Sequence, residues 1–189
     1  MKKYIITTVL AVLLVGCAGT SMSPEAKQTL ANNKGYTVGA VTVAFKKISF
    51  LDFSKEQKLY PNEQTLAKYF KEDMNKYLKQ TGKACTSKQT CLTIDMNVDY
   101  TRNFNFQSVT VSKPIVDMTY SIKKEEKVIY TGSKNGKLLS SSIVDRGLNE
   151  LSVLTNVGND KPNLKDERKH IDMLSGVVVE DIVTLSKNP

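Results

Sequence analysis

LTIDMNVDYT, residues 92–101, alternates apolar and polar side chains at every position. Successive side chains of a β-strand point to opposite faces of the sheet, so this stretch has one apolar and one polar face. The pattern is typical of an antiparallel sheet that is covered on one side and open to water on the other. We therefore expect a strand here, and the alternation continues through Phe104 and Phe106.

Further strands are expected on both sides of this stretch. Residues 36–45 are rich in valine and other β-forming residues. After Pro114, residues 115–123 alternate in the same way, and a polar turn at 124–126 leads back through residues 128–132 as a hairpin. The chain therefore predicts a sheet of about four strands.

One amphipathic helix is predicted between the first two strands. Apolar residues recur at helical spacing over residues 61–81. Pro61 suits the first turn of a helix, where its missing N–H is not needed. Gly82 follows at the position where a left-handed C-cap is expected.

A second amphipathic helix is predicted from Leu164 to Ser186, with Asn163 as its N-cap and Asp166 and Glu167 in the first turn. The fold class expected from these elements is α+β. It consists of a small, mainly antiparallel sheet of about four strands, with two helices packed on one face.

The N-terminus reads as an export signal. Lys2 and Lys3 precede an apolar run of roughly 11 residues, which is too short to span a bilayer. Leu14, Gly16 and Cys17 then resemble a bacterial lipobox. An ordinary secretory signal before a structural cysteine is the alternative.

The lipobox resemblance implies cleavage after Gly16, with palmitate or a similar acyl chain and a diacylglyceryl group on Cys17. Ala18, in place of aspartate, points to the outer membrane in enterobacteria-like systems. The expected organisation is a signal peptide at 1–16, a lipidated tether at 17–34 and a single α+β domain at 35–189. The tether could hold a short helix around 25–31, with too little apolar content to pack well. The domain would face the periplasm, and exposure at the cell surface is possible.

Cys85 and Cys91 remain once Cys17 is assigned to lipid. An even pair six positions apart in an exported protein predicts a local disulfide. Half of a metal site is the alternative, but the single histidine, His170, lies in a different expected element. We expect no metal and no cofactor.

The basic composition indicates a lysine-rich surface that keeps the protein soluble, with binding of an anionic partner as the alternative, and it points to no particular chemistry. Removing Lys2 and Lys3 with the leader lowers the formal charge from +8 to +6. The lysines are spread along the chain, so no nucleic-acid module is predicted. Asp95 and Asp99 lie about 13 Å apart along one strand, too far for a glycosidase pair. With no catalytic grouping, we expect a protein that is not an enzyme.

Two connections carry more apolar residues than a solvated loop needs. Residues 46–60 could form a contact patch or pack beneath the following helix. Residues 140–163 are long for a connection, and a short amphipathic helix is plausible within them. The candidate partner-contact residues are Phe50, Leu51, Phe53, Val144, Leu148 and Leu151.

The order of elements resembles that of Gram-negative envelope lipoproteins. These are the YajG-like proteins, the LptE-like lipopolysaccharide-assembly lipoproteins and the auxiliary lipoproteins of envelope ABC transporters. Elements similar to the YajG-like pattern are 40–45, 66–81, 92–100, 115–132 and 171–186.

The anchor, the tether, the absence of a catalytic grouping and the apolar-rich loops favour a lipid-anchored envelope protein without catalytic activity. We expect it to bind another envelope component in an assembly or accessory role. The alternatives are a binder of an anionic envelope molecule such as lipopolysaccharide, and a secretion-system or immunity lipoprotein. The expected partner is thus an envelope protein, and the membrane is contacted through the N-terminal lipid.

Overall fold

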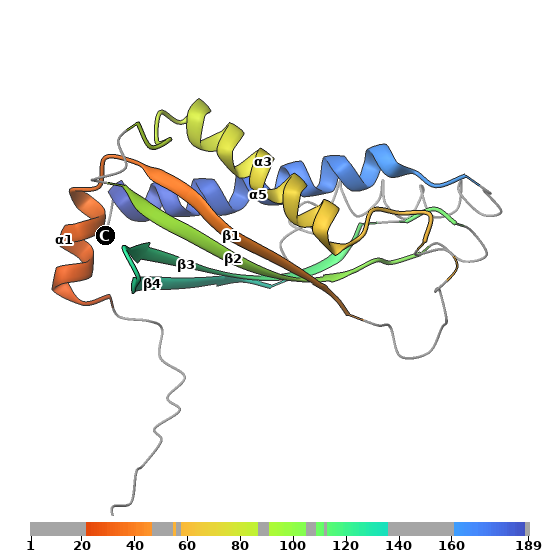
Figure 1. The fold of residues 1–189 in the computed structure, drawn as a ribbon, viewed down its shortest axis with the longest axis horizontal. Helices are drawn as coiled ribbons and strands as arrows, with labels where there is room; N and C mark the ends of the chain where they lie inside the picture. Colours follow the sequence, from red (N-terminus) through yellow and green to blue (C-terminus); the bar gives the residue numbers. More distant parts are fainter. Residues whose placement is uncertain are drawn as a thin grey trace, which may run out of the picture.

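A four-stranded mixed sheet is the framework of the protein (Figure 1). Its strands lie in the order β1 (Tyr36–Phe45), β2 (Leu92–Thr101), β3 (Ile115–Lys124) and β4 (Lys127–Lys134). β1 pairs with β2 in parallel, and the other two pairings are antiparallel. The predicted α+β class with a mainly antiparallel sheet is therefore confirmed.

The structure, a computed structural model, describes residues 22–46, 55, 58–86, 91–104, 109–111, 113–135 and 161–187. Several predicted features lie outside these residues: the signal peptide, Cys17, and the six partner-contact candidates Phe50, Leu51, Phe53, Val144, Leu148 and Leu151.

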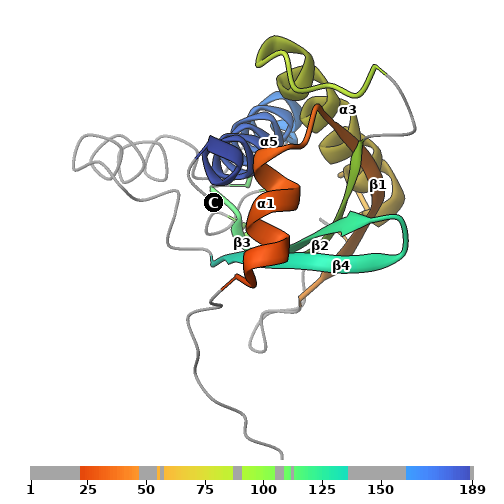
Figure 2. The same cartoon turned by 90° about the vertical axis from the view of Figure 1, so that its left-hand side faces the viewer.

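The alternation of β2 determines which face of the sheet is buried. Every second side chain of β2, from Leu92 to Tyr100, is buried in the main core, and the residues between them are half-buried or exposed. The in-register partners on β1 and β3 follow the same alternation, as Val98 beside Val43 and Met118 shows. The sheet thus has one buried face and one face without a helical cover among the described elements (Figure 2).

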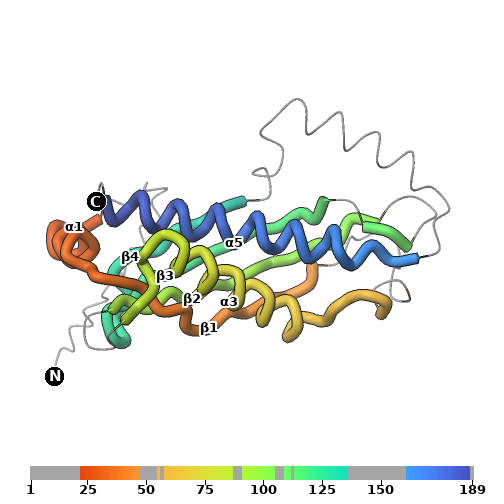
Figure 3. Tube along the Cα trace, turned by 90° about the horizontal axis from the view of Figure 1, so that it is seen from above, coloured from red at the N-terminus to blue at the C-terminus, as the bar shows by residue number. Residues whose placement is uncertain are grey.

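Two long helices run side by side along the sheet (Figures 1 and 3). They are α3 (Glu63–Gln80) and α5 (Leu164–Lys187), and α3 packs against both β1 and α5. α3 begins at Glu63, two residues later than expected, because Asn62 is its N-cap and accepts a hydrogen bond from the Thr65 N–H at 3.0 Å. Gly82 follows α3 with φ +67°, the left-handed conformation that the sequence predicted.

A third helix, α1 (Pro24–Ala31), lies where the sequence predicted a tether. The Ser23 hydroxyl caps it by accepting from the Ala26 N–H at 3.2 Å. Ala26 and Leu30 are buried, and Leu30 belongs to the main core. The expectation that this segment is too polar to pack well was wrong. α1 packs beside the C-terminal end of α5, across one end of the sheet and helix layers (Figure 2). Two buried side chains are enough to hold it there, because the other elements form the rest of the core.

The predicted disulfide is confirmed, and it links the loop after α3 to the start of β2. Cys85 and Cys91 are bonded, with their Cα atoms 5.8 Å apart. The Cys85 N–H donates to the Tyr36 carbonyl at 3.0 Å, and the Leu92 N–H donates to the Gly35 carbonyl at 3.1 Å. The disulfide therefore lies at the α1 end of the sheet, where β1 and β2 begin.

Replacing both cysteines, as Cys85→Ser with Cys91→Ser, should lower the free energy of unfolding by about 2 kcal/mol, because the unfolded chain loses a short covalent loop. Urea denaturation of the purified protein measures this. Adding a reductant should have the same effect on the unaltered protein and none on the double variant. An unaltered protein whose unfolding midpoint does not respond to reductant would contradict the prediction.

Candidate functional site

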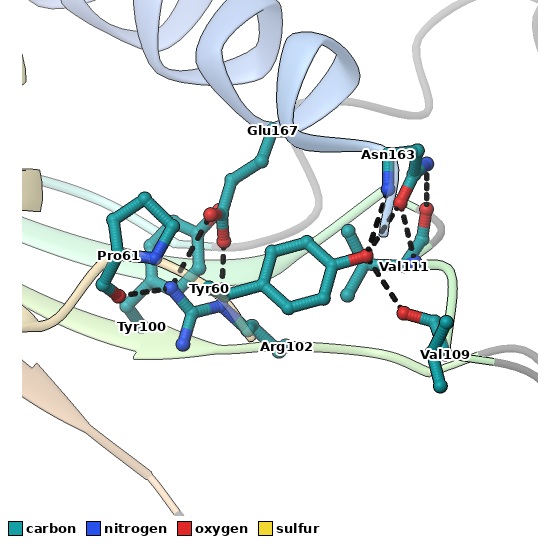
Figure 4. Close-up of polar contacts among 8 residues, drawn as sticks. All are labelled: Tyr60, Pro61, Tyr100, Arg102, Val109, Val111, Asn163 and Glu167. Carbon is teal, nitrogen blue, oxygen red and sulfur yellow. Dashed lines mark hydrogen bonds and ion pairs between the residues drawn. The ribbon is translucent and has the colours of Figure 1, made fainter. Parts of the chain in front are cut away.

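Buried polar groups gather at the end of the fold opposite α1, which we call the distal end. Here β1 and β2 end, and α3 and α5 begin (Figure 1). Two charged residues at this end, Arg102 and Glu167, are only 2 % and 1 % exposed. The distal cluster consists of Tyr60, Pro61, Tyr100, Arg102, Val109, Val111, Asn163 and Glu167 (Figure 4).

Arg102 and Glu167 form a buried ion pair at the centre of the cluster (Figure 4). The Arg102 Nε lies 2.6 Å from Glu167 Oε1, and its Nη2 lies 3.2 Å from Oε2. Nη2 also donates to the Pro61 carbonyl. Two parallel bonds between a guanidinium and a carboxylate are the geometry that best offsets the loss of hydration of both charges.

Aromatic rings enclose the Arg102 guanidinium. Its central carbon lies 4.5 Å from the ring centroid of Phe45 and 5.2 Å from that of Tyr60, distances that allow cation–π attraction. The Tyr100 hydroxyl donates to Glu167 Oε1 at 3.3 Å. Burial, followed by the negative charge of Glu167, raises the pKa of Tyr100 well above its ordinary value. Tyr100 therefore remains a protonated donor.

A second set of hydrogen bonds joins Tyr60, Asn163 and the segment around Val111. The Tyr60 hydroxyl has two acceptors at 2.7 Å, the Val109 carbonyl and Asn163 Oδ1, and it accepts from the Asn163 N–H at 3.1 Å. The Asn163 amide also pairs with the backbone of Val111, with both bonds at 2.8 Å. One asparagine side chain thus connects three separate segments.

Asn163 holds the expected N-cap position of α5, since its carbonyl also accepts the Glu167 N–H at 3.4 Å, but its side chain does not cap the helix. Its side-chain oxygen accepts from Val111 and Tyr60, and only its main-chain carbonyl accepts the Asp166 N–H, at 3.0 Å. With these bonds the Asn163 side chain joins two other segments to α5, whereas a side-chain cap would satisfy a single N–H of the helix.

The cluster holds together the ends of the two segments that the sequence nominated for partner contact. Tyr60 ends the first segment and Asn163 ends the second, and the two are directly hydrogen-bonded. The first segment also begins here, since the Lys46 N–H donates to the Tyr100 carbonyl at 3.0 Å. The candidate residues within these segments lie outside the described residues, so their own contacts stay predictions.

Sequence reasoning missed the Arg102–Glu167 pair, although one signal was present. Arg102 has the same parity as Tyr100 and Phe104, so it falls on the apolar face of the strand pattern. A charge at such a position needs a buried partner. The sequence does not say which carboxylate supplies it, because Glu167 is 65 positions away.

The charged and hydroxyl groups of the cluster bond mainly to one another. Its ion pair and Tyr100 are buried and engaged with one another. In the described part of the chain, no group of three or more His, Cys, Asp or Glu side chains could hold a metal ion.

The two aspartates on the open face of the sheet are paired separately. Asp95 lies 2.6 Å from Lys123 and accepts from the Ala40 N–H at 2.8 Å. Partial burial opposes ionisation of Asp95, but these two contacts outweigh it and lower its pKa. Asp99 lies 2.9 Å from Lys46.

Comparisons with known proteins place the chain in no family. No family model matches it, and no curated protein matches it. Among solved structures, it is similar to a 2.35 Å crystal structure of a minor lipoprotein from Acinetobacter baumannii. The identity is 9 % and the TM-score 0.32, over 79 % of this chain and 90 % of the other. Among the described residues, no helix combines the length and apolar character needed to cross a membrane.

Arg102→Met should lower the free energy of unfolding by about 3–5 kcal/mol, because Glu167 is then left buried without its partner. The double variant Arg102→Met with Glu167→Leu should recover much of this loss, since it buries no charge. Chemical denaturation of the single and double variants measures the coupling. Lys46→Met, which removes two exposed ion pairs, to Asp99 and Asp117, serves as the control and should change stability little. A small loss in Arg102→Met, similar to that of the control, would contradict the burial of the pair.

Lowering the pH from about 7.5 to 5.5 should destabilise the protein through His170. Burial lowers the pKa of His170 below its ordinary value of 6.5. The unfolded chain therefore binds more protons than the folded one just below pH 6.5, and stability falls as the pH drops through this window. His170→Gln should remove this part of the pH dependence. Unfolding free energies at several pH values test it, and an unchanged slope in the variant would refute it.

Proposed function

We propose that this protein is a lipid-anchored, non-enzymatic lipoprotein of the outer membrane, which faces the periplasm and binds another envelope protein at its distal end. The observation that carries the proposal is the Tyr60–Asn163 hydrogen bond. It fixes the ends of both apolar-rich segments at one place, so that two segments far apart in sequence can contribute to one contact surface.

The envelope location rests on the N-terminus and on the disulfide. Leu14, Gly16 and Cys17 match the positions that define a lipobox. The Cys85–Cys91 disulfide fits a protein that folds in an oxidising compartment such as the periplasm. The two features lie in different parts of the chain, and both point to export.

The position of α1 would set the orientation of a lipid-anchored molecule relative to the membrane. Cys17 precedes Pro24 by seven positions, which can span about 25 Å at most when extended. α1 lies at the end of the fold opposite the distal cluster (Figure 1). A lipid on Cys17 would therefore keep the α1 end near the membrane and leave the distal end directed away from it.

Cells fed a clickable fatty acid should label the protein on Cys17. Cys17→Ser should abolish the label and release the protein from the membrane fraction, since acyl chains supply the membrane affinity. The double variant Cys85→Ser with Cys91→Ser is the control and should retain the label. Ala18→Asp should move the protein to the inner membrane in an enterobacterial host. Label that persists in Cys17→Ser would overturn the anchor.

A further inference from the structure

α1 is attached to the rest of the fold along one side only. Ala26 and Leu30 are its only buried residues. A cleft of about 800 Å³ is lined by α1, the start of β2 and the β3–β4 turn, and a second cleft of about 190 Å³ is lined by α1 and the β3–β4 hairpin. Glu25 and Lys127 form an ion pair across this region at 3.7 Å, but both side chains are exposed, so the pair adds little.

α1 is too short to remain a helix on its own. It has eight residues, fewer than the roughly 12–15 that an isolated helix needs in water. The Ser23 cap and Pro24 favour the helical start, but they bury no surface. Docking and helix formation in α1 therefore depend on the same two buried side chains, and an undocked α1 becomes extended chain.

The chain that follows α1 is held much more firmly, at the start of β1. The Gly35 carbonyl accepts the Leu92 N–H at 3.1 Å, and the Tyr36 N–H donates to the Lys83 carbonyl at 2.8 Å. The Tyr36 side chain is buried in the main core, and the disulfide closes the loop that supplies both backbone partners. Residues 22–34 can therefore leave without opening the sheet, and release stops at Gly35.

We propose that α1 is a releasable part of the membrane tether, which controls how far the domain stands from the membrane. This inference rests on the proposed lipid anchor at Cys17. With α1 docked, the chain from Cys17 to Pro24 can span about 25 Å at most. With α1 released, the 18 positions from Cys17 to Gly35 can span about 65 Å at most. A partner that holds the distal end far from the membrane favours the released state.

Hydrogen exchange of single amides, followed by NMR on the purified protein, tests the release. The Lys27 and Asn32 N–H groups, which bond to carbonyls within α1 and its cap, should exchange about 100-fold faster than the buried amides of α5, because α1 opens without global unfolding. The Tyr36 N–H should stay with the slow amides of α5. Exchange in α1 as slow as in α5, or a Tyr36 N–H that exchanges together with α1, would overturn the proposal.

Two leucine variants separate local release from global unfolding. Leu30 and Leu78 are matched, since both are fully buried in the main core. Leu30→Ala should speed exchange in α1 by about tenfold or more and leave α5 nearly unchanged. Leu78→Ala should speed exchange in α5 and leave α1 nearly unchanged. If both variants accelerate α5 equally, α1 is an ordinary part of the core and the proposal is wrong.

Neutron reflectometry of the lipidated protein, on a supported bilayer of phosphatidylethanolamine and phosphatidylglycerol, measures the change in reach. Leu30→Asp should release α1 completely, because a carboxylate is not tolerated in the core. The domain should then lie about 10 Å farther from the bilayer, the increase expected when a flexible chain grows from seven to 18 positions. Glu25→Gln removes only the exposed ion pair and should leave the distance unchanged.

An unchanged distance in Leu30→Asp, with the α5 amides still protected, would exclude the release as a control of reach. If the aspartate unfolds the domain, Leu30→Ala decides the question, because it should shift the domain in the same direction by a smaller amount.

Failure of this proposal can be told apart from failure of the proposed function. If Cys17 carries no lipid, the anchor and the tether role of α1 both fall. If Cys17 is lipidated and α1 exchanges as slowly as α5, the anchor stands and the release is excluded. Photoreactive residues at Phe50 and Leu148 test the distal contact in intact cells. If they capture no envelope protein, the proposed partner is removed, while the release of α1 is still decided by exchange and reflectometry.

Discussion

The buried ion pair between Arg102 and Glu167 is the interaction on which the distal end depends. Two opposite charges with almost no exposure are tolerated only when they face each other. The end of β2 and the first turn of α5 must therefore meet, and the Pro61 carbonyl joins them through the same guanidinium. The rings of Tyr60 and Phe45, which come from two further segments, pack against the Arg102 guanidinium.

The two ends of the protein are closed by different means. At the α1 end, a disulfide and backbone hydrogen bonds hold the starts of β1 and β2, and Leu30 covers the core. At the distal end, side-chain hydrogen bonds and one ion pair hold the connecting segments. A covalent bond closes the first end and withstands changes of pH. The second end relies on complementary partners, and the loss of one of them leaves another group buried and unpaired.

Sequence reasoning succeeded where one element's own pattern is decisive. The alternation of residues 92–101 and the apolar stripes of the two long helices reflect burial on one face, which is a local property of each element. The disulfide could be inferred from cysteine number and spacing. The failures share another cause. The burial of α1 depends on other elements that its own sequence cannot show. Asn163 holds the N-cap position, but its side chain bonds to Tyr60 and Val111, which lie far away in the sequence.

The sequence by itself determined the strands, the two long helices, the disulfide and the candidate lipid attachment at Cys17, because periodicity, spacing and short motifs are written in consecutive residues. Only the tertiary structure decided that residues 60, 102 and 163 meet and that α1 belongs to the core. Each of these depends on contacts between positions far apart in the chain. Many carboxylates and amides could have met the same requirements, and packing of the whole fold selects among them.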